Sequence, residues 1–201
     1  MTTYDFEDGN GPVPAHQHPY GGGWVADTSK VSKTAYVGPD AKVFGKAWVS
    51  SDAKVFGDVQ VFGNAQVSGN AQVFGNVQVF DDAWVSGTAE VSGKAWVFGN
   101  AWVFGTAEVS GNAQVFDDAW VSGNADVFGK AWVSKTPIVI SGFQYLVVIT
   151  DSLITVGCKQ GTFDYWKQSG VDIIVNEGFS EKKAKSFLKA LLSVARLHGL
   201  S

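Results

Sequence analysis

The sequence predicts a mainly β chain that coils as a triangular parallel β-helix and ends in a small C-terminal α/β cap. Twenty valines stand six residues apart without a slip, from Val25 to Val139. A second period of eighteen residues sorts the side chains between these valines into columns of like residues. A fixed short period is typical of a solenoid, in which each unit contacts mainly its neighbours. Helix is excluded, because a six-residue repeat does not stay on one face of a helix with about 3.6 residues per turn.

A typical repeat is AWVFGT at residues 101–106. Its first four residues alternate between inward and outward positions, which is the period of a strand, so Ala101 and Val103 are expected inside. Pairs such as Gly-Asn, Gly-Lys or Asp-Asp end the repeats and predict turns, because Gly and Asn tolerate positive φ. The interior is therefore expected to consist of valine and alanine columns.

The outward positions fall into three faces when every eighteenth residue is compared. One face carries phenylalanines directly after its valines: Phe44, Phe62, Phe80, Phe98 and Phe116. The next carries tryptophans directly before its valines, interrupted by Gln66: Trp48, Trp84, Trp102 and Trp120. The third is polar: Lys54, Gln72, Glu90, Glu108 and Asp126. Like residues in register predict three strands per coil, with neighbouring coils about 4.8 Å apart.

The solenoid is expected over residues 24–137, between an N-terminal cap segment at 1–23 and a C-terminal α+β cap at 138–201. A parallel β-helix leaves open strand edges at both ends, and open edges invite further pairing, so both flanking segments are expected to cover them. Proline and glycine dominate residues 11–23, which predicts an irregular loop there.

The C-terminal cap is expected to combine strands with one helix. Residues 137–157 predict two or three β segments, with turns at Gly142 and at Asp151–Ser152. A helix is predicted near 180–198, because Ser180 is a good N-cap and Gly199 a good stop signal.

The run VFGNAQVSGNAQVFGNVQVF at residues 61–80 resembles the hexapeptide repeat of left-handed β-helix proteins. In that repeat an aliphatic residue is followed four positions later by a small one, as with Val61 and Ala65. The left-handed sense of the coil is implied by this resemblance and not by the periodicity. The chain also resembles hexapeptide proteins of phages and prophages that have no settled activity. The shared blocks are GPVPAHQHPYGGGWVA at 11–26 and VITDSLITVGCKQGTFDYW at 148–166.

The composition disfavours some classes of partner and indicates a cellular compartment. The net charge is −4 and no basic stripe follows any face, which disfavours nucleic acid. No uninterrupted apolar run approaches a membrane span. The segment MTTYDFEDGNG has neither a basic start nor an apolar stretch, so no signal peptide is expected, and the protein is placed in the host-cell cytoplasm or the virion. Cys158 is the only cysteine and is expected to pack as a small apolar residue.

Catalysis is disfavoured, and neither a catalytic residue nor a cofactor is assigned. Acyltransferases with hexapeptide repeats resemble one another in a catalytic histidine on or near the coils. This chain has no histidine between His18 and His198, so the general base of acyl transfer is missing from that place. An acyltransferase-like enzyme with a site between subunits remains the alternative.

Two candidate metal sites are weak. His16 and His18 point the same way in an extended chain, a spacing suited to metal, but hydrogen bonds to backbone in the cap are the favoured interpretation. Asp81–Asp82 and Asp117–Asp118 occupy equivalent turns, where calcium is conceivable and solvated carboxylates are favoured.

The aromatic columns carry the main functional hypothesis. If both columns were left in water, they would exceed the few hundred Å² of contiguous apolar surface usual on a monomer. The Phe and Trp columns are therefore expected to form an oligomer interface, unless stacking along the coil covers them. The resemblance implies a homotrimer, which would present the polar column to a host or virion protein. Carbohydrate binding on the Trp column is a further alternative.

Overall fold

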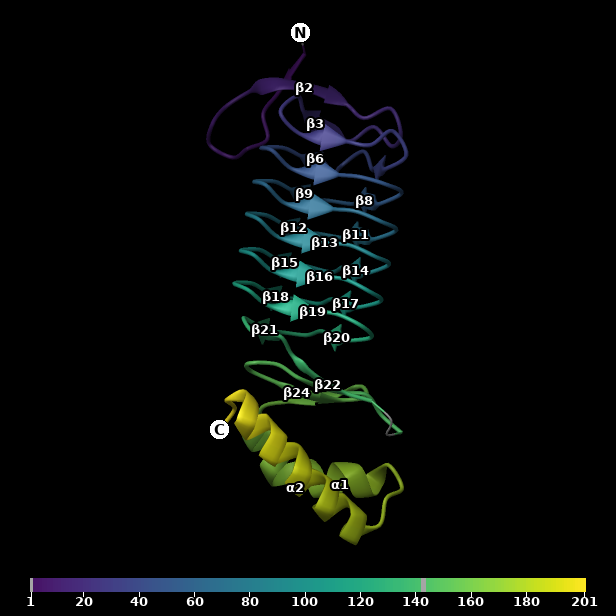
Figure 1. Cartoon of the computed structure of the whole chain (residues 1–201), viewed down its shortest axis with the longest axis vertical. Helices are drawn as coiled ribbons and strands as arrows, with labels where there is room; N and C mark the ends of the chain where they lie inside the picture. Colours follow the sequence, from purple (N-terminus) through teal and green to yellow (C-terminus); the bar gives the residue numbers. More distant parts are fainter. Residues whose placement is uncertain (1, 142–143) are drawn as a thin grey trace.

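The computed structural model describes residues 2–141 and 144–201. The expected turn at Gly142 lies outside the described residues. Figure 1 shows a tall column of stacked coils, with the N-terminal segment closing one end and two helices beyond the other. The chain is a β-solenoid with about eighteen residues per turn, followed by a small sheet and two helices.

The first sheet carries the expected Phe column. Its strands are, in order, β1 (Thr3–Tyr4), β2 (Val13–Gln17), β3 (Trp24–Ala26), β6 (Lys42–Val43), β9 (Gln60–Val61), β12 (Gln78–Val79), β15 (Trp96–Val97), β18 (Gln114–Val115) and β21 (Trp132–Val133). From β3 onward the pairing is parallel, whereas β1 and β2 pair antiparallel.

The second sheet carries the expected Trp column. Its strands are β4 (Lys30–Val31), β7 (Trp48–Val49), β10 (Gln66–Val67), β13 (Trp84–Val85), β16 (Trp102–Val103) and β19 (Trp120–Val121). The third sheet carries the polar column on β5 (Tyr36–Val37), β8 (Lys54–Phe56), β11 (Gln72–Phe74), β14 (Glu90–Val91), β17 (Glu108–Val109) and β20 (Asp126–Val127).

Strand register confirms the eighteen-residue coil. Trp102 pairs with Trp120, and Val103 with Val121. The interior valines and alanines are fully buried in most coils, and Val59 and Val77 fill the alanine position in two of them. The last valine of the series, Val139, is an exception. It lies in the antiparallel C-terminal sheet and is only partly buried against the solenoid core. The left-handed sense of the coil stays an expectation.

The turns need residues that accept a left-handed backbone. Gly63 has φ 70°, and a Cβ built on it would lie 2.9 Å from the backbone nitrogen of Asp81 on the next coil. Asp81 and Asp117 adopt the same conformation, with φ of 58° and 54°. Aspartate is one of the few residue types that tolerate this region, so the Asp-Asp turns are a structural solution.

The N-terminal segment is more regular than the prediction of an irregular loop, because residues 13–17 form β2. It covers the first coil with aromatic rings. Phe6 is buried and stacks on Phe44, with ring centroids 4.9 Å apart, and Tyr4 stacks on Trp24 at 4.3 Å. Phe6 thus extends the Phe column one step beyond the coils.

The C-terminal unit contains an antiparallel sheet and two helices. The strands are β22 (Ile138–Ile140), β23 (Val147–Ile149), β24 (Ile154–Val156) and β25 (Lys159–Gly161), paired in that order. Helix α2 (Glu181–His198) begins after Ser180, whose side chain accepts a hydrogen bond from the Lys183 amide. Helix α1 (Phe163–Asn176) was not predicted. Among the described residues, no helix is long and apolar enough to cross a membrane.

Candidate functional site

The Phe column is a stack of parallel rings. Centroids of successive rings lie 4.9–5.2 Å apart, and their planes differ by at most 9°. Phe44 is buried under Phe6, and the other four rings are half-buried within a single chain. Stacking along the coil therefore covers much of this column, which is the alternative to an oligomer interface.

The Trp column is less well covered. Trp102 and Trp120 stack with centroids 5.1 Å apart and planes within 6°, yet Trp120 is still 48 % exposed. Trp84 meets Trp102 edge-on at 4.8 Å and donates its indole N–H to Ser68 Oγ at 3.1 Å. Trp48 is 49 % exposed, and its neighbours in the column are Lys30 and Gln66.

Sequence reasoning missed two further exposed tryptophans, on the first sheet. Trp96 leans edge-on against Phe80 at 6.2 Å, and Trp132 against Phe116 at 6.3 Å, with Trp132 55 % exposed. They stand thirty-six residues apart in the same column, with Gln114 between them. That spacing of two coils was the signal that could have found them. Exposed indoles therefore occupy both the first and the second sheet.

The polar column holds three acidic side chains on successive coils. Glu90 pairs with Glu108, and Glu108 with Asp126, so like charges stand directly opposite one another. Burial, together with the charge of Glu108, raises the pKa of the Asp126 carboxyl above its ordinary value. Lys54 and Gln72 complete the column toward the N-terminal end. The polar column is therefore negatively charged over three successive coils.

The histidine pair does not form a joint site. His16 is exposed, and its Nδ1 lies 2.8 Å from Asp27 Oδ1, whereas His18 is buried and its Nδ1 lies 3.2 Å from the carbonyl oxygen of Tyr20. In the part of the chain that the structure describes, no group of three His, Cys, Asp or Glu residues could hold a metal ion.

The Asp-Asp turns are held by amides of the preceding coil. Asn64 donates its side-chain amide to Asp82 at 2.9 Å, and Asn100 donates to Asp118 at 3.1 Å. The carboxylates of Asp82 and Asp118 therefore stabilise the turns by linking neighbouring coils.

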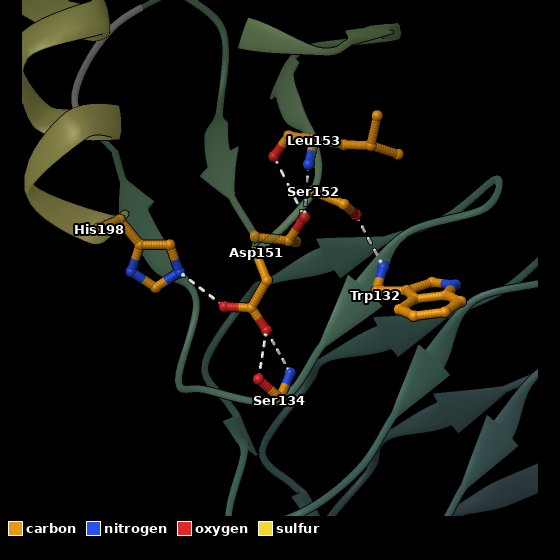
Figure 2. A network of polar contacts seen from close by, with 7 residues as sticks. Trp132, Ser134, Asp151, Ser152, Leu153 and His198 are labelled. Carbon is orange, nitrogen blue, oxygen red and sulfur yellow. Dashed lines mark hydrogen bonds and ion pairs between the residues drawn. The ribbon is translucent and has the colours of Figure 1, made fainter. Parts of the chain in front are cut away.

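Side chains of the C-terminal unit complete the hydrogen bonds of the last coil (Figure 2). In earlier coils the corresponding amides donate to the next coil, as Phe116 does to the Val133 carbonyl at 2.9 Å. At the end of the solenoid, Ser152 Oγ accepts from the Trp132 amide at 3.0 Å, and Asp151 Oδ2 accepts from both the amide and the hydroxyl of Ser134. Carboxylate and hydroxyl groups thus replace the carbonyls of a missing coil.

His198 at the end of α2 faces this junction. Its Nε2 lies 3.6 Å from Asp151 Oδ1 (Figure 2). Both atoms are buried, and neither has a hydrogen-bond partner among the residues that the structure describes. Burial lowers the pKa of His198, the Lys135 charge lowers it further, and the Asp151 charge opposes them. Ser134, His198 and Asp151 have the residue types of a nucleophile–base–acid triad, but they do not have its geometry. The Ser134 hydroxyl donates to Asp151 Oδ2, whereas His198 faces the other carboxylate oxygen, so the histidine is not placed to take the serine proton.

Comparison with known proteins agrees with the architecture. A family model described as the YdcK β-solenoid repeat matches residues 65–87, which lie in the middle of the coils. No curated protein matches the chain. The match and the strand pairing together support a β-solenoid repeat protein.

Proposed function

We propose that this protein is a non-catalytic scaffold that self-associates through its exposed tryptophans and offers its acidic column to a partner. The observation that carries the proposal is the exposure of the indoles on two adjoining sheets: Trp48, Trp96, Trp102, Trp120 and Trp132. An aromatic side chain buries about 150–250 Å² when fully covered, so five half-exposed rings offer about 500 Å². A stable interface buries about 800 Å² per partner, and this apolar area would supply much of it.

Within the proposal, a homotrimer is the favoured assembly. Its support is the resemblance of the repeat to hexapeptide proteins, which associate in parallel around a threefold axis. We assign the main contribution to this interface to the tryptophans and not to the Phe column, because the phenylalanine rings already cover one another within one chain. A phage-encoded role, as a virion component or as a blocker of a host factor, rests on the resemblance of the two end segments alone.

The test is the solution mass, measured by light scattering after size exclusion. The double variant Trp102→Ser and Trp120→Ser should turn the oligomer into a monomer, because it removes the stacked exposed pair. The matched control is the double variant Gln72→Ser and Glu90→Ser, which changes two half-buried outward positions on the third sheet, away from all five exposed tryptophans. An oligomer of unchanged mass in the tryptophan variant would refute the proposed interface.

One hollow favours carbohydrate binding as a second candidate function. Trp48 lies in a surface depression of about 460 Å³ with Thr28, Lys30, Lys46, Asn64 and Gln66 around it. An exposed flat ring surrounded by amide, hydroxyl and ammonium donors suits a sugar ring that stacks and hydrogen-bonds. Trp48→Ala should abolish quenching of tryptophan fluorescence by a binding glycan, and Trp96→Ala should not. If no glycan in a broad panel changes the fluorescence of the intact protein, this candidate is wrong.

The acyltransferase alternative gains no support from the site geometry. His16 contacts Asp27 on the surface, and His18 is buried against the backbone of Tyr20. Isothermal titration of the intact oligomer with coenzyme A tests this alternative directly, and binding would reopen it.

A further inference from the structure

A separate cavity lies in the C-terminal unit, away from the solenoid surfaces. It has a volume of about 150 Å³ and lies between α1, the start of α2 and the turn that joins β24 to β25. Its walls are mainly apolar. Four aromatic side chains line it, Tyr145, Trp166, Phe179 and Phe187, together with the aliphatic Val156, Ile173 and Ile174. The self-association described above uses none of these residues.

The walls are held in place by the fold. Trp166 is fully buried, and its indole N–H donates to the carbonyl of Ile154 at 2.8 Å, which fixes the ring against the sheet. Val156 and Ile174 are also buried. A cavity whose walls are already ordered costs little conformational entropy when it is filled.

The mouth of the cavity carries a short chain of hydrogen bonds. The Gln144 amide donates to the Tyr145 hydroxyl at 3.1 Å, and that hydroxyl donates to Glu177 Oε2 at 3.0 Å. Gly157 has φ 57°, and a Cβ built on it would lie 3.0 Å from the Tyr145 ring, so glycine is what lets this ring pack on the turn. The Glu177 carboxylate keeps lone pairs that a further donor can reach.

We propose that this cavity binds a small molecule with one aromatic ring and one hydrogen-bond donor, of the phenol class. An apolar cavity of about 150 Å³ in another protein accommodates benzene, so the volume fits a single ring. Aromatic walls favour a flat ring over an open chain. The donor of the ligand meets the Glu177 carboxylate at the mouth, and the same carboxylate repels an anionic substituent.

Cys158 provides the readout in the unmodified protein. It is the only cysteine of the chain, it is an exposed residue with a free thiol, and it lines the same cavity. Alkylation by iodoacetamide, followed by mass spectrometry, measures access to that thiol with and without phenol. At a phenol concentration of about ten times its Kd, mass action leaves about one tenth of the cavities empty, so alkylation should slow about tenfold. A rate that does not change up to saturated phenol would overturn the proposal.

Benzoate tests whether the Glu177 carboxylate at the mouth of the cavity selects against an anionic ligand. It has the same ring, but it places a carboxylate beside Glu177, and it should protect Cys158 at least tenfold less well than phenol at equal concentration. Lys159 also lines the cavity, and its ammonium would favour the opposite order. Protection by benzoate equal to or better than that by phenol would overturn the phenol class.

A filling substitution locates the bound ring. Ile173→Phe adds volume on the α1 wall and should abolish protection by phenol. The matched control is Val175→Phe, which changes a half-buried residue of the same helix that does not line the cavity. Retained protection in a folded Ile173→Phe variant would place phenol elsewhere and overturn the proposal. If that variant does not fold by circular dichroism, the experiments on the unmodified protein decide.

Discussion

The polar junction between the solenoid and the C-terminal unit gives the sharpest prediction. Asp151→Ala removes the acceptor of two hydrogen bonds, from the amide and the hydroxyl of Ser134. A hydrogen bond to a charged group contributes about 1.5–3 kcal/mol, and a buried donor left unsatisfied costs a similar amount. The Asp151 side chain is 20 % exposed, so water replaces part of the loss. The C-terminal unit should therefore dock more weakly by about 3 kcal/mol.

Limited proteolysis with trypsin measures this docking. Lys135 is exposed in the connection between β21 and β22, at the junction itself. Where opening is fast compared with cleavage, the cleavage rate follows the population of the undocked state. A loss of about 3 kcal/mol should accelerate cleavage after Lys135 on the order of a hundredfold.

Two control variants test whether the effect comes from the hydrogen bonds of Asp151 or from the loss of any carboxylate. Asp151→Asn keeps an acceptor oxygen and should fall between the native chain and the alanine variant. Asp118→Ala removes a carboxylate from an exposed turn, where it accepts from Asn100, and should change stability by no more than about 0.5 kcal/mol. Equal cleavage rates for the native chain and Asp151→Ala, or for the two alanine variants, would refute the role given to Asp151.

Two further predictions concern pH and the core. Because burial lowers the pKa of His198 below its ordinary 6.5, the unfolded chain binds a proton more readily than the folded one. The contribution of neutral, buried His198 to the stability of the fold is thus fully present above about pH 6.5. It is lost as the pH falls through the lower pKa that His198 has in the folded chain. Thermal melts at pH 7.5, 6.5 and 5.5 should show this loss, and His198→Asn should flatten it; an unchanged slope would remove His198 as the cause. Val79→Asp should abolish the β-sheet circular dichroism of the solenoid, since it buries an unpaired charge, whereas outward Gln78→Asp should keep it; a folded Val79→Asp variant would contradict the inward assignment.

The coils could be predicted because spacing alone fixes which residues stack. Once an eighteen-residue coil is assumed, Trp102 must lie opposite Trp120, and the pairing has this register. Whether the stacked rings cover one another depends on the angle of each ring plane, which spacing does not determine. The Phe planes are almost parallel and the Phe column is half-buried within one chain, whereas the equally parallel pair Trp102 and Trp120 stays partly exposed.

The C-terminal unit was harder to predict because its signals are mixed. The buried positions of α1 are Phe163, Trp166, Gly170 and Ile174, which is a helical spacing, and the Thr162 side chain caps the first turn. A glycine inside this pattern and the β-branched run at residues 173–175 weaken the signal. Cys158 was expected to be packed and is exposed, because it lies in the turn between β24 and β25. That turn is fixed by strand pairing, which is a tertiary feature.

The two ends of the solenoid are closed by different means, and the difference has a consequence for stability. At the N-terminal end, β2 continues the first sheet through antiparallel backbone pairing with β3, and Phe6 continues the ring stack. At the C-terminal end the amides of β21 and Ser134 are satisfied by the side chains of Ser152 and Asp151. A side-chain acceptor depends on one residue, whereas a backbone ladder does not. The C-terminal junction is therefore the end that a single substitution can open, and opening it would expose strand edges that pair readily with other chains.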